Sequence, residues 1–117
     1  MKKRKILIVE NKDFIGKVIE TTLSEDYVCI RVAGAAEAVA AFSHADAAVV
    51  SDNLDEQKGP ALLNKFKLDR PEVPVVMMTS EMTSTTRINY LRAGADDVMA
   101  KPFNPIELKL RVNRLLK

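Results

Sequence analysis

The chain has 117 residues, of which 47% are hydrophobic and 29% are charged. This composition is typical of one folded domain and excludes a disordered tail or a membrane-spanning bundle. The net charge of +2 is too small to indicate nucleic-acid binding from the overall field alone, and no apolar stretch approaches the length of a membrane span. We therefore expect one domain over residues 1–117 that contacts neither nucleic acid nor a membrane directly.

The single cysteine, Cys29, excludes an internal disulfide and suits a reducing compartment. The apolar run from Ile6 to Val9 is too short for the core of a signal peptide. These features predict a cytoplasmic protein in which Cys29 is an inert buried thiol. His44, the single histidine, stands in a polar turn and is expected at the surface.

Short apolar segments rich in β-branched residues alternate along the chain with longer segments of helical spacing. Continuous apolar runs of this length are typical of strands covered on both faces. The expected strands cover residues 6–9, 28–32, 47–50, 73–78 and 97–100.

The segments between and after these strands have helical signals. In the first one, apolar residues recur on one face and the Asp13 side chain is available as an N-terminal cap. Gly94 predicts the end of the fourth helix, and Asn104 with Pro105 predicts the start of the fifth. The later helices are expected over 35–42, 61–68 (with Pro60 in the first turn), 83–93 and 106–116.

This (βα)5 order predicts a doubly wound α/β three-layer sandwich, with a parallel sheet between two layers of helices. In such folds the functional crevice lies beyond the carboxyl ends of the strands. Oxygen ligands there suit Mg²⁺, and a lysine with a hydroxyl can hold phosphate oxygens, although polar loops are common in any fold of this class. The polar residues that follow the strands are Glu10, Asn11, Ser51, Asp52, Asn53, Thr79, Ser80 and Lys101.

Three segments resemble the receiver domain of response regulators: AGADDVMAKPF at 93–103, KILIVE at 5–10 and VPVVMMT at 73–79. The similarity extends from about Lys5 to Leu116. It implies the flavodoxin-like (CheY-like) strand order 2-1-3-4-5 and a role in two-component (phosphorelay) signal transduction. In that family a histidine kinase supplies a phosphoryl group to an aspartate at the end of the third strand, beside a bound Mg²⁺.

The resemblance also implies roles for single residues. Lys101 matches the lysine that pairs with the phosphoryl group, Thr79 the switching hydroxyl, and Glu10 the first acid of the metal-binding pair. Two positions depart from the pattern, since Asn11 stands where the second acid is usual and Val98 where a switching Tyr or Phe is usual. An amide oxygen can coordinate Mg²⁺ but adds no negative charge, so the implied site is weakened.

The position of the phosphoacceptor is the largest departure. The ungapped match is Ser51, and the flanking landmarks Asp46, Leu54 and Gly59 agree on that register. Asp52 comes one residue late, and because strand side chains alternate between faces, its carboxylate should point away from where Ser51 points. Only a shift of the third strand by one residue would return Asp52 to the pocket. Asp55 also replaces the proline that usually follows the acceptor.

Two hypotheses follow. In the first, the chain is an atypical pseudo-receiver, a protein-interaction module that acts without phosphorylation, with Mg²⁺ weakened or absent. In the alternative, it is a working Mg²⁺-dependent phosphoacceptor that uses Asp52, with Glu10, Asn11 and Asp52 as metal ligands; its chemistry would then be at most autocatalytic phosphoryl transfer rather than that of a true enzyme. A flavin or nucleotide enzyme is disfavoured because residues 10–16 contain no glycine- or hydroxyl-rich phosphate loop.

Partners are implied only by the resemblance. A histidine kinase or another signalling protein is expected, and the fourth helix, fifth strand and fifth helix resemble the face through which receivers of winged-helix transcription regulators form symmetric dimers. The charged residues of that face are Arg87, Asp96, Asp97, Glu107 and Arg111.

Overall fold

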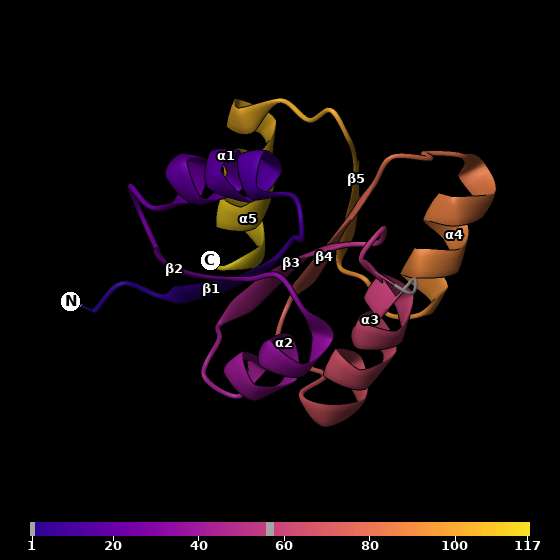
Figure 1. The fold of residues 1–117 in the computed structure, drawn as a ribbon, viewed down its shortest axis with the longest axis horizontal. Helices are drawn as coiled ribbons and strands as arrows, with labels where there is room; N and C mark the ends of the chain where they lie inside the picture. Colours follow the sequence, from indigo (N-terminus) through magenta and orange to yellow (C-terminus); the bar gives the residue numbers. More distant parts are fainter. Residues whose placement is uncertain (1, 56–57) are drawn as a thin grey trace.

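The computed structural model describes residues 2–55 and 58–117. Strands and helices alternate along the whole chain (Figure 1). The strands are β1 (Lys5–Val9), β2 (Val28–Val32), β3 (Ala47–Ser51), β4 (Val75–Thr79) and β5 (Asp97–Ala100). The helices are α1 (Asp13–Leu23), α2 (Ala35–Phe42), α3 (Lys58–Asp69), α4 (Ser84–Arg92) and α5 (Pro105–Leu115). Within the described part of the chain, no helix combines the length and apolar character that a membrane crossing requires.

All strand pairs are parallel, and the sheet order is β2-β1-β3-β4-β5. Helices α1 and α5 lie on one side of this sheet, and α2 and α3 lie on the other (Figure 1). Each side has its own buried apolar cluster, in which alternate residues of a strand belong to opposite faces. The predicted flavodoxin-like α/β fold and its strand order are therefore confirmed.

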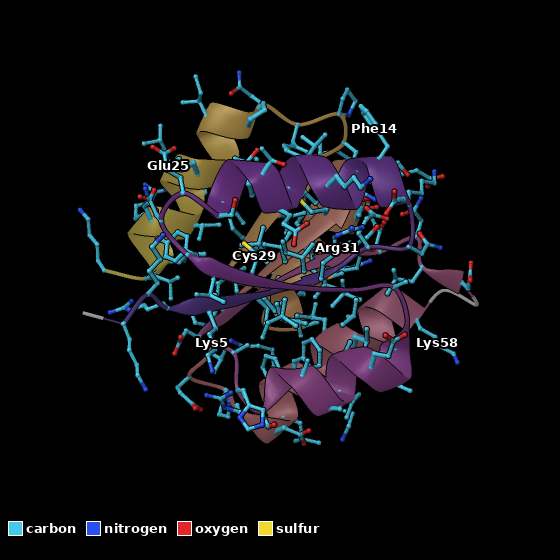
Figure 2. The ribbon with its side chains drawn as sticks, turned by 60° about the vertical axis from the view of Figure 1, so that its left-hand side comes forward. Lys5, Phe14, Glu25, Cys29, Arg31 and Lys58 are labelled. Atoms are coloured by element: carbon cyan, nitrogen blue, oxygen red, sulfur yellow. The ribbon has the colours of Figure 1, made fainter. Side chains whose placement is uncertain are left out.

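Strand β2 lies at the edge that the predicted order gives it, but it is not covered on both faces as its apolar run suggested, because no residue of it is buried. Its Arg31 lies against α1 (Figure 2), where it pairs with Asp13 at 2.8 Å and with Glu20 at 3.4 Å. Gly16 leaves room for this side chain, since a Cβ there would lie 2.8 Å from Arg31 Cδ. Cys29 on the same strand is partly rather than fully buried.

Two helix starts also differ from the prediction. Asp13 is the first residue of α1 rather than its cap, and its carboxylate pairs with Arg31 and Lys17 instead. Helix α3 begins at Lys58, before Pro60. By contrast, Asn104 caps α5 as predicted, because its side chain accepts hydrogen bonds from the backbone N–H groups of residues 106 and 107.

The alternation of side chains decides what reaches the carboxyl edge of the sheet. On β3, Ala47 and Val49 belong to the cluster under α1 and α5, whereas Ala48 and Val50 belong to the cluster under α2 and α3. The next residue, Ser51, continues the first series, and Asp52 continues the second. The strand thus delivers a hydroxyl and a carboxylate to opposite faces.

Candidate functional site

Lys101 is the centre of a partly buried polar group at the carboxyl edge of the sheet, which we call the lysine cluster (Glu10, Ser51, Asn53 and Lys101). The Lys101 ammonium donates to Glu10 Oε1 at 2.8 Å, to Ser51 Oγ at 2.5 Å and to Asn53 Oδ1 at 3.0 Å. Glu10 and Ser51 are each 2% exposed. An ammonium has three hydrogens, so these three acceptors use its whole capacity for hydrogen bonds.

The acceptors of the cluster are also engaged. Glu10 Oε2 accepts from the backbone N–H of Lys12 at 3.2 Å, and the Ser51 hydroxyl donates to Asn53 Oδ1 at 2.6 Å. Because Ser51 Oγ accepts from a cation while its proton is held by an amide oxygen, it has no general base to activate it as a nucleophile. The lysine cluster is a closed charge-neutral network, since one ammonium faces one carboxylate.

Asp52 lies on the other side of β3. Its Oδ2 accepts a hydrogen bond of 2.7 Å from the hydroxyl of Tyr90, on helix α4. Burial raises the pKa of Tyr90, and the hydrogen bond to the Asp52 carboxylate raises it further. Thr79 is buried near this pair, and its Oγ1 accepts from the backbone N–H of Glu81 at 3.0 Å. The structure therefore brings Ser51, Glu10 and Lys101 together, and it brings Asp52 to Tyr90 instead.

Gly59 explains why β3 and α3 meet in this register. A Cβ at Gly59 would lie 2.4 Å from the Ser51 carbonyl oxygen and 2.5 Å from Asp52 Cα, so only glycine allows this approach. Leu54, in the loop between them, is 5% exposed and belongs to the apolar core. The Asp46 carboxylate accepts from the backbone N–H of Lys5 at 2.7 Å, which ties the start of β3 to β1.

The remaining predicted metal ligand, Asn11, lies beside Asp55. Asn11 Nδ2 donates to Asp55 Oδ1 at 3.1 Å, and Asn11 Oδ1 is buried with no hydrogen-bond partner among the described residues. No group of three or more His, Cys, Asp or Glu side chains comes together within the described ranges 2–55 and 58–117 in a way that could hold a metal ion. The side-chain oxygens at this place include the Asn11 amide, the lysine-bound Glu10 carboxylate and the exposed Asp55 carboxylate that accepts from Asn11.

The charges expected on α4, β5 and α5 are largely paired within the chain. Arg111 Nη1 lies 2.6 Å from Asp97 Oδ1, and Arg111 Nη2 lies 3.6 Å from Glu107 Oε2. Hydrogen bonding to Asp97 is the main cause that raises the pKa of Arg111. Asp96 is held elsewhere, since its Oδ2 accepts from Lys67 Nζ on α3 and from the backbone N–H of Val75. The sequence set of five therefore separates into three charges that meet between β5 and α5, an acid that binds α3 and β4, and Arg87, which is exposed on α4.

Two residues of the site were not assigned a role from the sequence. Asn53 follows Ser51 by two residues, and this spacing was the available signal that both could face Lys101. A tyrosine in a helix, such as Tyr90, is usually read as a packing residue or as a residue at the rim of a core. It stands one helical turn before Gly94, but nothing local to α4 indicates that its hydroxyl reaches the end of β3.

A groove of about 390 Å³ opens beside the lysine cluster, between the start of α1 and the segment that joins β5 to α5. Phe14, on α1, is 75% exposed at its edge (Figure 2). Pro102 and Phe103 line the groove on the side of the β5–α5 segment, and the mostly buried Lys101 side chain also contributes to its lining. The cluster is thus accessible from a surface that is mainly apolar.

Comparison with known proteins agrees with this geometry. Residues 6–113 match the family model of the response regulator receiver domain. The chain is 34% identical over 97% of its length to the regulatory protein VanR of Enterococcus faecium, and 32% identical over 97% of its length to the transcriptional regulatory protein PmrA of Pectobacterium parmentieri. It covers 50% and 52% of these two proteins, so the chain spans about half the length of these curated relatives.

Solved structures show the same fold. The receiver domain of DrrB, described as activated by BeF3, superposes with a TM-score of 0.92 at 26% identity, with 97% of each chain covered. A CheY-like receiver domain protein from Methanospirillum hungatei superposes with a TM-score of 0.90 at 28% identity, with 98% of this chain and 94% of that chain covered. On the match of its sequence and its fold, the chain belongs to the response regulator receiver domain family of two-component signalling.

Proposed function

We propose that this receiver domain is a pseudo-receiver, a protein-interaction module of two-component signalling that works without phosphorylation. The observation that carries the proposal is the contact between Lys101 and the Ser51 hydroxyl, at the position where the family has its acceptor carboxylate. A hydroxyl group cannot form the acyl phosphate on which the family's switch depends. The chain is thus proposed to be a binding module rather than an enzyme.

The state of Lys101 supports the same proposal. Its three hydrogens are bound to Glu10, Ser51 and Asn53, so a phosphoryl oxygen would have to displace one of these acceptors. The pair is buried, with side-chain exposures of 8% for Lys101 and 1% for Glu10. Breaking a buried ion pair leaves an uncompensated charge, which opposes the opening that phosphorylation would need.

The donor set also fits the family's magnesium ion poorly. Mg²⁺ is bound mainly through carboxylates and water in near-octahedral geometry. Here the unpartnered Asn11 Oδ1 and the adjacent, exposed Asp55 carboxylate favour a cation, while Glu10 is neutralised by Lys101 and Asp52 Oδ2 faces Tyr90. We therefore propose that Mg²⁺ binds weakly or not at all, and no step of the function depends on it.

The alternative is a working phosphoacceptor that uses Asp52. It requires the Asp52 carboxylate to leave Tyr90 and enter the lysine cluster, with a shift of β3 by one residue. Incubation with acetyl phosphate and Mg²⁺, followed by intact-protein mass spectrometry, tests both hypotheses. The proposal expects no phosphoryl-sized mass gain. A gain that disappears in Asp52→Ala would overturn it and establish the alternative.

The groove beside α1 supports a protein partner, a histidine kinase or another signalling protein. Its walls are apolar, and the exposed Phe14 and the partly buried Phe103 offer aromatic contact area. Exposed aromatic residues of this kind are enriched where proteins bind each other. The single, partly buried cysteine and the family together support a cytoplasmic location for this interaction.

A homodimer through α4, β5 and α5 is the second interaction that we propose. Ile88 and Leu91 of α4 are 45% and 43% exposed, which gives this face apolar area beside the Asp97–Arg111 pair. In a symmetric dimer the same charges would meet their counterparts on the second copy. Sedimentation should detect dimers of the wild type and monomers of Asp97→Arg. Monomers for both proteins would remove the proposal.

A further inference from the structure

The contact between Asp52 and Tyr90 joins two elements that are far apart in the sequence. It runs from the residue after β3 to the seventh residue of α4, with 2.7 Å between Asp52 Oδ2 and the Tyr90 hydroxyl. Both residues line a hollow of about 290 Å³ between the end of β3 and α4, which Asn53 of the lysine cluster also borders. A hydrogen bond to a carboxylate is roughly twice as strong as one between neutral groups.

Helix α4 has little else to hold it. No residue from Ser84 to Arg92 is buried, in contrast to α1, α2, α3 and α5, each of which buries at least two side chains among its described residues. Tyr90 is the residue within α4 that packs against the buried core, and Ala93 follows it just after the helix. The ring of Tyr90 and its hydroxyl are therefore the main anchor of α4 to the sheet.

The side chains next to this contact provide no second link between the end of β3 and α4. The Thr79 hydroxyl is bound by the backbone N–H of Glu81, and Val98 on β5 is a buried aliphatic residue without a polar group. Val98 therefore has no polar group to move toward α4, and the Thr79 oxygen is already held by the segment that leads into α4. The aromatic hydroxyl that reaches the strand end belongs to α4 itself.

We propose that the hydrogen bond between Asp52 and Tyr90 sets the position of α4 against the sheet, so that loss of this bond releases α4. Asp52 then acts through Tyr90 as a positioning residue for the α4 surface. Such an element is biased between a held and a released arrangement by whatever engages the carboxylate. The inference goes beyond the proposed function, because it holds whether or not the lysine cluster accepts a phosphoryl group.

Native-state hydrogen exchange on the full chain tests the proposal, with peptides that cover 84–93 as the readout. We expect Tyr90→Phe and Asp52→Ala, which remove the donor and the acceptor respectively, each to accelerate exchange in α4 by about tenfold, while exchange in β1 and β3 stays near the wild-type rate. The double variant should exchange no faster than either single variant, because both remove the same bond. This non-additivity separates coupling between the two groups from two independent losses of stability.

Tyr27→Phe is a matched control. It also removes a tyrosine hydroxyl with one hydrogen bond, to Asn113 Oδ1 on α5, and should leave α4 unchanged. Three results would overturn the proposal: α4 exchange at the wild-type rate in Tyr90→Phe and Asp52→Ala, an equal acceleration across all elements, or effects that multiply in the double variant. None of these results depends on the acetyl phosphate experiment, so the two proposals fail separately.

Discussion

Ser51 Oγ lies 2.5 Å from Lys101 Nζ, while the carboxylate of the adjacent Asp52 points to the opposite side of β3 and binds Tyr90. The two polar groups that end β3 therefore serve different parts of the domain. The hydroxyl completes a closed network around a buried ion pair, and the carboxylate holds a helix.

Ser51→Asp should return an acid to the lysine cluster. In the background of Asp52→Ala, the new carboxylate would lie beside Lys101, which stabilises its charge, and would be the single acceptor at the end of β3. We expect incubation with acetyl phosphate and Mg²⁺ to give a phosphoryl-sized mass gain that the parent Asp52→Ala protein does not show. The measurement is intact-protein mass spectrometry.

Adding Asn11→Asp to that variant sharpens the test. The second carboxylate supplies the negative charge that the amide lacks, so the Mg²⁺ concentration needed for half-maximal labelling should fall. If neither Ser51→Asp/Asp52→Ala nor the triple variant with Asn11→Asp is labelled, the lack of phosphorylation has a cause other than the missing acids.

Removing Lys101 should destabilise the domain strongly. Lys101→Met leaves the Glu10 carboxylate buried without its partner, which costs about 3–5 kcal/mol of the free energy of unfolding. Urea unfolding followed by circular dichroism measures this loss. The double variant Lys101→Met with Glu10→Gln should recover much of it, because the orphaned charge is gone. A loss under 1 kcal/mol in the single variant would show that Glu10 finds water or another cation.

Much of the fold was predictable because its signals are local. Apolar runs that alternate with segments of helical spacing indicate the order of the elements. Asn104 marks the start of α5 through its capping side chain, and Gly94 marks the end of α4 through its positive φ angle. The opposite orientation of Ser51 and Asp52 was also predictable, since it follows from strand alternation once a register is chosen. The exposure of β2 could not be predicted from its own apolar run, because it depends on the edge position that the strand order gives it.

The site was harder to predict where it depends on tertiary placement. No local pattern shows that Tyr90 on α4 reaches Asp52, or that Asp96 turns to Lys67 on α3 while Asp97, the next residue, binds Arg111. These contacts are decided by how each helix lies on the sheet. The sequence therefore predicts which residues reach the strand ends better than which partners they find there.

Cys29 should be slow to alkylate near neutral pH. Burial is the main cause that raises the pKa of its thiol to about 11, from 9.0, and the charge of Glu20 adds to the effect. Because the thiolate is the reactive form, the rate of reaction with iodoacetamide should rise about tenfold for each pH unit until the pH reaches about 11. The urea-unfolded chain is the control, and its rate should level off near pH 9. A plateau near pH 9 in the folded protein would contradict the expectation.

The same shift predicts how stability depends on pH. Since the folded-state pKa of Cys29 lies above the unfolded value, the unfolded chain loses its proton first as the pH rises. The contribution of this thiol is present below about pH 9 and declines between about pH 9 and pH 11. Cys29→Ala should lose less stability than the wild type over that interval in urea unfolding at several pH values. Parallel curves for the two proteins would contradict the assignment.

Gly59 should be the glycine least tolerant of a side chain, and it tests the register on which the assignment of Ser51 depends. A Cβ at Gly59 would overlap the backbone of residues 51 and 52, which cannot move without shifting β3. Gly59→Ala should therefore cost about 2–4 kcal/mol in urea unfolding. Gly34→Ala is the control, because its Cβ would meet only the flexible end of Glu37 at 3.4 Å, and it should cost no more than about 1 kcal/mol. Equal losses in the two variants would mean that α3 does not press on the end of β3, and the register would then be free to slip.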